Sequence, residues 1–272
     1  MNATRDIRTS FLKHQLKKKF DLRPINSPIR ELDLANKTNV LIVAPHADDE
    51  VIGCAGLIQK LVYQGANIVV LFVTIEDEKS IVKPSYSEGM NVRERESLKA
   101  KKKLNFNEAV YLRIPERSID NNIKTQNDIK QSILSIISQK KINVILLPNY
   151  FDMNPDHRSI SKIGLKTVHE SIVNNASNSV NSILLYEIWG PVYVTHFCRL
   201  SQTEYDTKLE SMQCYETQMQ TVDYLSIIDE IKNIREKNLK QHCPDALSES
   251  KSLELYEFIN PNKISEYLIQ NT

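Results

Sequence analysis

Four residues that can bind a metal ion or move a proton lie within five consecutive positions: His46, Asp48, Asp49 and Glu50. A histidine followed three residues later by an aspartate on a tight turn can direct an imidazole nitrogen and a carboxylate oxygen to one point, and these ligands suit zinc. Asp48 would then lie close to the metal without necessarily binding it, where a general base could take a proton from metal-bound water. An acidic helix cap is the competing interpretation, and the histidine favours the metal site.

The flanking residues predict the strand, turn and helix that must position these groups. Residues 40–44 are almost wholly apolar, as expected of a strand buried on both faces of a parallel sheet. The run breaks at Pro45, and apolar residues return with helical spacing between Val51 and Val62. Ligands of open α/β sheets are held by the loops that leave the carboxyl ends of strands, so the polar groups should face a crevice.

The sequence Pro-His-Ala-Asp-Asp-Glu at residues 45–50 resembles the first motif of the PIG-L/LmbE family of zinc-dependent N-deacetylases. That motif usually has proline where this chain has Ala47. The resemblance implies a Rossmann-like fold and the removal of acetyl groups from amino sugars or related amides. It also implies a third metal ligand about a hundred residues further along the chain, after another strand.

A second histidine occurs at the expected place. His157 follows the apolar residues 144–147 and precedes a helix expected over residues 158–165. Two strand-to-helix loops of one sheet can converge where the winding reverses. His46, Asp49 and His157 would then provide three ligands to zinc with one position left for water, as in catalytic sites. Two imidazoles and one carboxylate also suit Fe(II).

The second motif departs from the family pattern, because the chain has Asn154-Pro-Asp-His where many members have His-Pro-Asp-His. The first histidine of relatives is thought to stabilise the oxyanion or protonate the leaving amine, whereas Asn154 can only donate a hydrogen bond. Either Asp48 or another group delivers the proton, or activity is impaired. Asp156 is retained and is expected to accept from an imidazole and hold its orientation. His196 is a candidate replacement acid, although a surface or packing role is favoured.

Arg93 is the candidate substrate-binding residue. It opens a helix expected to run to about Leu104, and this resembles the family's Arg-x-x-Glu helix start, in which the arginine faces the substrate. Caps and surface ion pairs are the competing interpretation of such charges. Residues 76–92 precede this helix and predict a long loop that could fold over the site. Residues 208–218 fit one further helix and resemble a later segment of the family, a lysine followed by His-x-Ser-Gln, with Tyr215 in place of the histidine and Thr217 in place of the serine.

Strands alternate with helices along most of the chain. Further strands are expected at residues 68–75, 109–114, 144–147, 182–188 and 255–259, with a helix over residues 125–140, and residues up to Phe197 could add an edge strand. The pattern predicts an α/β, Rossmann-like fold with a mostly parallel central sheet, helices on both faces and an added C-terminal segment. Residues 1–35, with a basic cluster, are expected to form an N-terminal arm. Residues 36–272 are expected to form one domain, elaborated from about residue 190.

Composition excludes several classes of protein. The net charge of +1 gives no electrostatic case for a nucleic-acid partner. The four cysteines have no Cys-x-x-Cys spacing, which favours reduced thiols in a cytoplasmic protein over disulfides or zinc ligands. No apolar run approaches the roughly twenty residues that span a bilayer, and the N-terminus lacks the apolar core of a signal peptide. A soluble protein is expected, with no signal for its oligomeric state.

These observations and the resemblance imply a hydrolase that removes an acetyl group from an N-acetylated amino sugar or a related glycoconjugate. Zinc-bound hydroxide would attack the amide carbonyl, and Asp48 would take the proton and return it to the amine. A nucleotide-binding Rossmann protein would need Gly-x-Gly-x-x-Gly in the first turn, where the carboxylates of this chain would repel a pyrophosphate. A family member that has lost catalysis and binds a glycan stays open because of Asn154, although retention of Asp48 argues against it.

Overall fold

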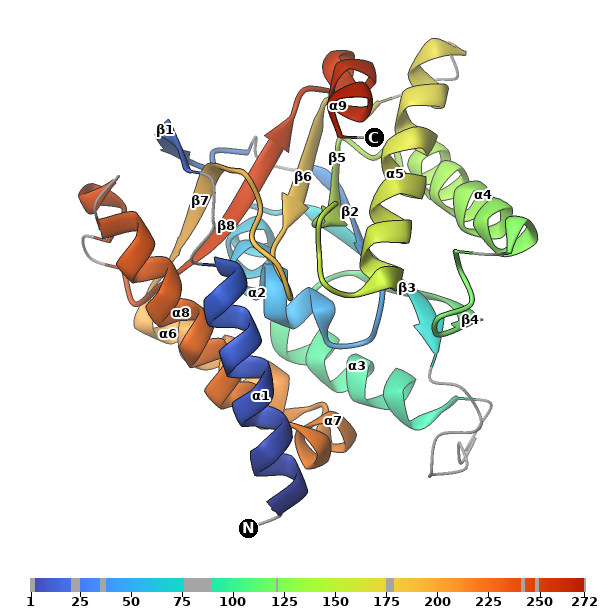
Figure 1. Ribbon diagram of the computed structural model, residues 1–272. Coiled ribbons are helices and arrows are strands. Elements are labelled where there is room, and N and C mark those ends of the chain that lie inside the picture. Colours follow the sequence, from blue (N-terminus) through green and yellow to red (C-terminus); the bar gives the residue numbers. More distant parts are fainter. Residues whose placement is uncertain are drawn as a thin grey trace.

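The computed structural model describes residues 3–20, 25–34, 38–75, 90–120, 122–174, 179–240, 243–247 and 250–271. Their centre is an eight-stranded sheet in the order β1-β7-β8-β6-β5-β2-β3-β4 (Figure 1). The strands are β1 (Ile25–Glu31), β2 (Asn39–Ala44), β3 (Asn67–Ile75), β4 (Glu108–Pro115), β5 (Val144–Pro148), β6 (Ser182–Tyr186), β7 (Val194–Leu200) and β8 (Ser252–Ile259). Only β8 runs antiparallel to its neighbours β6 and β7, so the predicted mostly parallel α/β sheet is confirmed.

Helices cover both faces of the sheet (Figure 1). They are α1 (Ala3–Phe20), α2 (Asp49–Tyr63), α3 (Val92–Leu104), α4 (Ile123–Lys140), α5 (Pro155–Val173), α6 (Gln202–Gln213), α7 (Glu216–Thr221), α8 (Tyr224–Lys240) and α9 (Ile264–Gln270), with 3-10 turns η1 (Pro244–Leu247) and η2 (Pro261–Lys263). One hydrophobic core lies between the sheet and the side of α1, α2, α3, α6 and α8. The other lies between the sheet and the side of α4, α5 and α9.

Two neighbouring central strands position the chemistry. β2 and β5 consist of buried apolar residues apart from Asn39, and they pair in parallel with Ile42 opposite Leu146. The chain passes from β2 to β3 and β4 on one side, then crosses to β5 and β6 on the other. The winding therefore reverses between β2 and β5, and the loops leaving these two strands border the crevice that this reversal creates.

The N-terminal residues contact the rest of the fold. Helix α1 packs against α8, where Lys17 Nζ lies 3.2 Å from Glu230 Oε1. Strand β1 pairs in parallel with β7 and forms one edge of the sheet. The expectation that β7 is an edge strand is therefore wrong, because β1 and β8 pair on either side of it.

The helix expected over residues 208–218 is divided in two. Helix α6 ends at Gln213, and α7 begins at Glu216. Tyr215 lies between them and is completely buried, so the chain changes direction where this side chain enters the core. The expected lid, residues 76–92, falls outside the described residues as far as residue 89. Within the described part of the chain, no helix has both the length and the apolar character needed to cross a membrane.

Candidate active site

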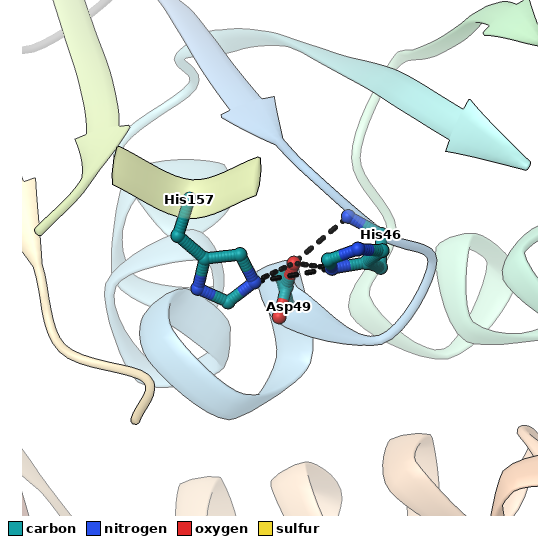
Figure 2. A group of neighbouring side chains, drawn as sticks. All are labelled: His46, Asp49 and His157. Atoms are coloured by element: carbon teal, nitrogen blue, oxygen red, sulfur yellow. Dashed lines mark hydrogen bonds and ion pairs between the residues drawn. The ribbon is translucent and has the colours of Figure 1, made fainter. Parts of the chain in front are cut away.

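Side chains from two strand-to-helix loops converge on one point (Figure 2). Asp49 Oδ2 lies 3.2 Å from His46 Nδ1 and 3.2 Å from His157 Nε2, and the two imidazole nitrogens are 3.1 Å apart. Ligand atoms of a tetrahedral zinc site at ordinary bond lengths are about 3.3 Å apart. The three atoms form a triangle of nearly that size, so the residues fit a divalent metal ion such as zinc.

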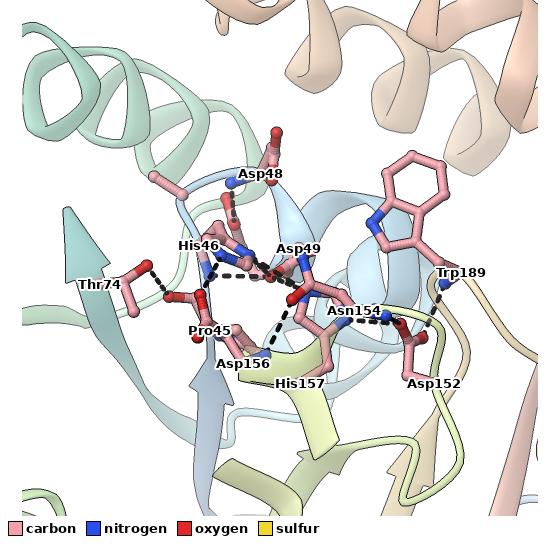
Figure 3. A network of polar contacts seen from close by, with 12 residues as sticks. Pro45, His46, Asp48, Asp49, Thr74, Asp152, Asn154, Asp156, His157 and Trp189 are labelled. Carbon is pink, nitrogen blue, oxygen red and sulfur yellow. Dashed lines mark hydrogen bonds and ion pairs between the residues drawn. The ribbon is translucent and has the colours of Figure 1, made fainter. Parts of the chain in front are cut away.

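Local structure explains how His46 and Asp49 come together. Thr74 of β3 donates backbone and side-chain hydrogen bonds to the carbonyl of Pro45 and fixes the chain as it leaves β2 (Figure 3). Asp49 is the first residue of α2, and its carboxylate accepts a 2.8 Å hydrogen bond from the backbone N–H of His46. The three-residue spacing therefore closes a tight turn, as its pattern predicted.

His157 lies in the first turn of α5. Asn154 caps this helix, because its side-chain oxygen accepts from the backbone N–H of Asp156, and Pro155 occupies the first turn, where its missing N–H costs nothing. These local preferences start the helix earlier than the sequence pattern indicated. They place the completely buried His157 ring against Asp49.

Each imidazole turns its second nitrogen toward another carboxylate. His46 Nε2 lies 3.3 Å from Asp156 Oδ2, and His157 Nδ1 lies 3.2 Å from Asp152 Oδ1. A proton on each of these outer nitrogens leaves His46 Nδ1 and His157 Nε2 with lone pairs for a metal. Asp156 contacts an imidazole as expected, whereas Asp152 was not singled out from the sequence because it precedes the recognised motif.

The charges of the site favour a cation at its centre. Burial lowers the pKa of His46, but Asp156 and Asp49 outweigh burial and raise the pKa to about 10. Burial likewise lowers the pKa of His157, and Asp49 and Asp152 raise it to about 9. Burial raises the pKa of Asp49, but the two imidazoles hold this pKa below its ordinary value. Without metal the histidines therefore carry protons near neutral pH, which a metal ion would displace.

Asp48 adjoins this group without belonging to the triangle. Burial raises the pKa of its carboxyl well above the ordinary range, opposed by the guanidinium of Arg93, whose Nη2 lies 3.5 Å from Asp48 Oδ2. Arg93 also donates to the carbonyl of Ala47. The arginine predicted to contact substrate therefore contacts the candidate base as well.

A cavity of about 160 Å³ opens beside the triangle. Its lining includes five of the residues singled out from the sequence, namely His46, Asp48, Asp49, Arg93 and Asn154. Four more lining residues were missed: Glu116, Trp189, Gln218 and Tyr224. Trp189 directly follows a strand, which is a usable signal, and Gln218 ends the segment 208–218, whose resemblance to a later segment of the family is weak. Tyr224 begins the distant helix α8 and has no local signature.

Within the described part of the chain, His196 does not line this cavity. Its Nδ1 lies 2.9 Å from the hydroxyl oxygen of Thr195, and its ring packs against that of Phe258. This agrees with the packing role that was favoured for it.

The chain resembles proteins of known structure and one protein family. The family model described as PIG-L, GlcNAc-PI de-N-acetylase, matches residues 41–168. An N,N'-diacetylchitobiose deacetylase from Pyrococcus horikoshii is 17% identical, with a TM-score of 0.64 over 85% of this chain and 89% of that chain. The deacetylase of the pseudoaglycone of the antimicrobial reagent A40926 is 17% identical, with a TM-score of 0.59 over 83% of this chain and 98% of that chain. The 4-carboxy-2-hydroxymuconate hydratase of Pseudomonas putida is 15% identical, with a TM-score of 0.62 over 82% and 96%. At these identities, the structural matches establish the fold alone.

Proposed function

Since residues 41–168 form a PIG-L domain, we propose that this chain is a metal-dependent hydrolase that removes the acetyl group from an N-acetylated amino sugar or a related glycoconjugate. The observation that carries the proposal is the triangle of His46 Nδ1, Asp49 Oδ2 and His157 Nε2 beside a cavity lined by Asp48. A protein of the same fold is described as an N,N'-diacetylchitobiose deacetylase, which supports an N-acetylated amino sugar as the class of substrate.

Zinc is the metal that we propose, with Fe(II) as the alternative, and His46, Asp49 and His157 are its proposed ligands. A divalent metal held there would supply a water of lowered pKa and polarise the amide carbonyl. Asp156 and Asp152 would keep the two imidazole rings in the tautomers that leave Nδ1 of His46 and Nε2 of His157 for the metal.

Asp48 is the proposed proton carrier. It accepts a proton from the attacking water and passes it to the amide nitrogen as the C–N bond breaks, so that acetate and a free amine leave. Burial of Asp48 raises the pKa of its carboxyl, which supports this role because the carboxylate then holds more strongly the proton that it takes from water. The missing family histidine at position 154 therefore need not be replaced by a separate acid.

Arg93 and Asn154 are the proposed polar contacts to substrate. Arg93 is held against Asp48 and the carbonyl of Ala47, and it lines the cavity. The side-chain oxygen of Asn154 is engaged in capping α5, so its NH₂ group is the part that can donate to the amide oxygen as negative charge develops there.

The second candidate function is a glycan-binding protein without catalysis, and Asn154 in place of a histidine favours it. Retention of Asp48 beside the proposed ligands weakens it, because binding alone needs no base there.

The four cysteines are free thiols, which supports the proposed cytoplasmic location.

Acetate release distinguishes the two candidates. The zinc-loaded protein is incubated with N-acetylglucosamine, N,N'-diacetylchitobiose and N-acetylated sugar nucleotides, beside Asp48→Asn and the metal-free protein. Release that requires both the metal and Asp48 supports the hydrolase. Binding of a sugar without release, at saturating concentration and with stoichiometric zinc, overturns the hydrolase in favour of the glycan-binding protein.

A further inference from the structure

A buried chain of hydrogen bonds leads from Tyr215 through Glu50 to the backbone of Asp48. Tyr215 Oη donates to Glu50 Oε1 at 2.5 Å, and Glu50 Oε2 accepts from the backbone N–H of Asp48 at 3.1 Å. Tyr215 and Glu50 are both completely buried, and neither lines the cavity. Glu50 therefore contacts the backbone of Asp48 directly, and Tyr215 is linked to it through Glu50.

Asp48 needs such support because its backbone is strained. Its φ is 131°, in a region that side chains other than glycine rarely adopt. Such a conformation persists only where the surroundings fix it. The backbone carbonyl of Asp48 accepts from the N–H groups of Val51 and Ile52 in α2, and these hydrogen bonds fix the peptide group that follows Asp48. Glu50 holds its N–H, and with it the direction in which the Asp48 side chain leaves the backbone.

Tyr215 can hold Glu50 because its own position is fixed. It lies at the junction of α6 and α7, and two residues later Thr217 donates through both its backbone N–H and its hydroxyl to Glu96 of α3. Helix α3 also carries Arg93, which contacts the Asp48 carboxylate. Tyr215, through Glu50, thus supports the backbone of Asp48 from one distant segment, and Arg93 supports its side chain from another.

We infer that Tyr215 and Glu50 form a positioning pair that aims the Asp48 carboxylate at the cavity. The inference rests on the proposed function, in which Asp48 carries the proton. Burial raises the pKa of the Tyr215 hydroxyl well above its ordinary value, and Glu50 raises it further, so this hydroxyl stays a donor throughout the working pH range.

The fold provides a matched control at another buried tyrosine. Tyr205 of α6 donates its hydroxyl to Asp229 Oδ1 of α8 at 2.5 Å and is 3% exposed, and it does not line the cavity. Tyr215→Phe and Tyr205→Phe each remove one hydroxyl that donates to a carboxylate. Both variants should lower the melting temperature by similar amounts, which separates the effect on stability from the effect on Asp48.

Steady-state kinetics and zinc titration then test the pair. Tyr215→Phe should lower kcat about tenfold or more, because small displacements of a reacting group are costly, while KM and zinc affinity stay within about twofold of the wild type. Tyr205→Phe should keep the kcat of the wild type. Glu50→Gln, which can still accept from the Asp48 N–H, should lose less kcat than Glu50→Ala.

Equal kcat values for Tyr215→Phe and Tyr205→Phe would overturn the inference. So would a loss in Tyr215→Phe that appears only in zinc affinity, because the pair would then support the metal and not the base. Binding of a sugar to the zinc-loaded wild type without acetate release is a separate result that rejects the proposed function itself.

Discussion

One carboxylate joins a proposed metal ligand to the cavity wall: Asp152 Oδ1 lies 3.2 Å from His157 Nδ1, and Asp152 Oδ2 accepts a 2.8 Å hydrogen bond from the backbone N–H of Trp189. Asp152 is buried and lies in the loop that leaves β5, whereas Trp189 follows the neighbouring strand β6 (Figure 3). The orientation of the His157 ring and the position of the only tryptophan in the chain therefore depend on the same side chain.

Replacing Asp152 should weaken the metal site. Asp152→Asn removes the negative charge beside His157 Nδ1, and loss of such an outer partner typically costs about 10- to 100-fold in metal affinity. Competition with a chromophoric zinc chelator measures the change. Asp206→Asn, at an exposed position of α6, is the control and should bind zinc as the wild type does. Equal affinities in the two variants would show that Asp152 does not support His157.

Metal binding should release protons and weaken in acid. The pKa values of His46, about 10, and His157, about 9, mean that both imidazoles are protonated at pH 7 in the metal-free protein. Each must lose a proton to bind the metal, so the apparent affinity should fall by up to about a hundredfold per pH unit as the pH is lowered from 8 to 6. Calorimetric titrations in buffers of different ionisation enthalpy would count about two released protons. An affinity independent of pH would contradict the proposed ligand pair.

Asp48→Asn should lower kcat strongly and leave metal binding nearly unchanged. The amide keeps the shape of the side chain but cannot take a proton from water, and general base catalysis contributes about 10²- to 10⁴-fold. We therefore expect kcat to fall by that factor, with zinc affinity within about threefold of the wild type, because Asp48 is no member of the ligand triangle. Retention of kcat would show that another lining residue is the base. Glu116 would then be the candidate, because it also carries a carboxylate.

Asn154→Asp separates the two roles of Asn154. An aspartate still caps α5 through a side-chain oxygen but lacks the NH₂ group that we propose to face the substrate. The melting temperature should stay close to that of the wild type, while kcat/KM falls by about tenfold or more. Asn122→Asp changes the equivalent cap of α4, away from the cavity, and should keep the kcat/KM of the wild type. Equal kcat/KM values for the two variants would remove Asn154 from the proposed site.

A buried ion pair should anchor the helix that begins at the site. Lys208 Nζ lies 2.7 Å from Glu254 Oε1, and Glu254 accepts from the N–H groups of Gly56 and Leu57 in α2. Lys208→Met leaves a buried carboxylate without its cation, which typically costs about 3–5 kcal/mol of unfolding free energy. Chemical denaturation measures this loss. The double variant Lys208→Met/Glu254→Gln should recover part of the lost unfolding free energy. If its loss equals the sum of the losses in the two single variants, the two side chains are not coupled.

Short-range patterns in the sequence determined much of this protein. The apolar runs at residues 40–44 and 144–147 predicted buried parallel strands, and the structure confirms them as β2 and β5. The three-residue spacing of His46 and Asp49 determined their approach, because a tight turn at a helix start leaves few other arrangements. The position of His157 after a strand followed from the rule that such loops meet at one end of a sheet.

Only the tertiary structure decided which distant groups complete the site. Gln218 and Tyr224 reach the cavity from α7 and α8, and the periodicity of these segments does not indicate which part of the sheet they approach. The placement of β7 inside the sheet depended on pairing with β1, a contact between residues far apart in the chain. Tyr215 meets Glu50 for the same reason. Side-chain periodicity reports which face of an element is buried, whereas the partner that buries it is chosen by packing of the whole chain.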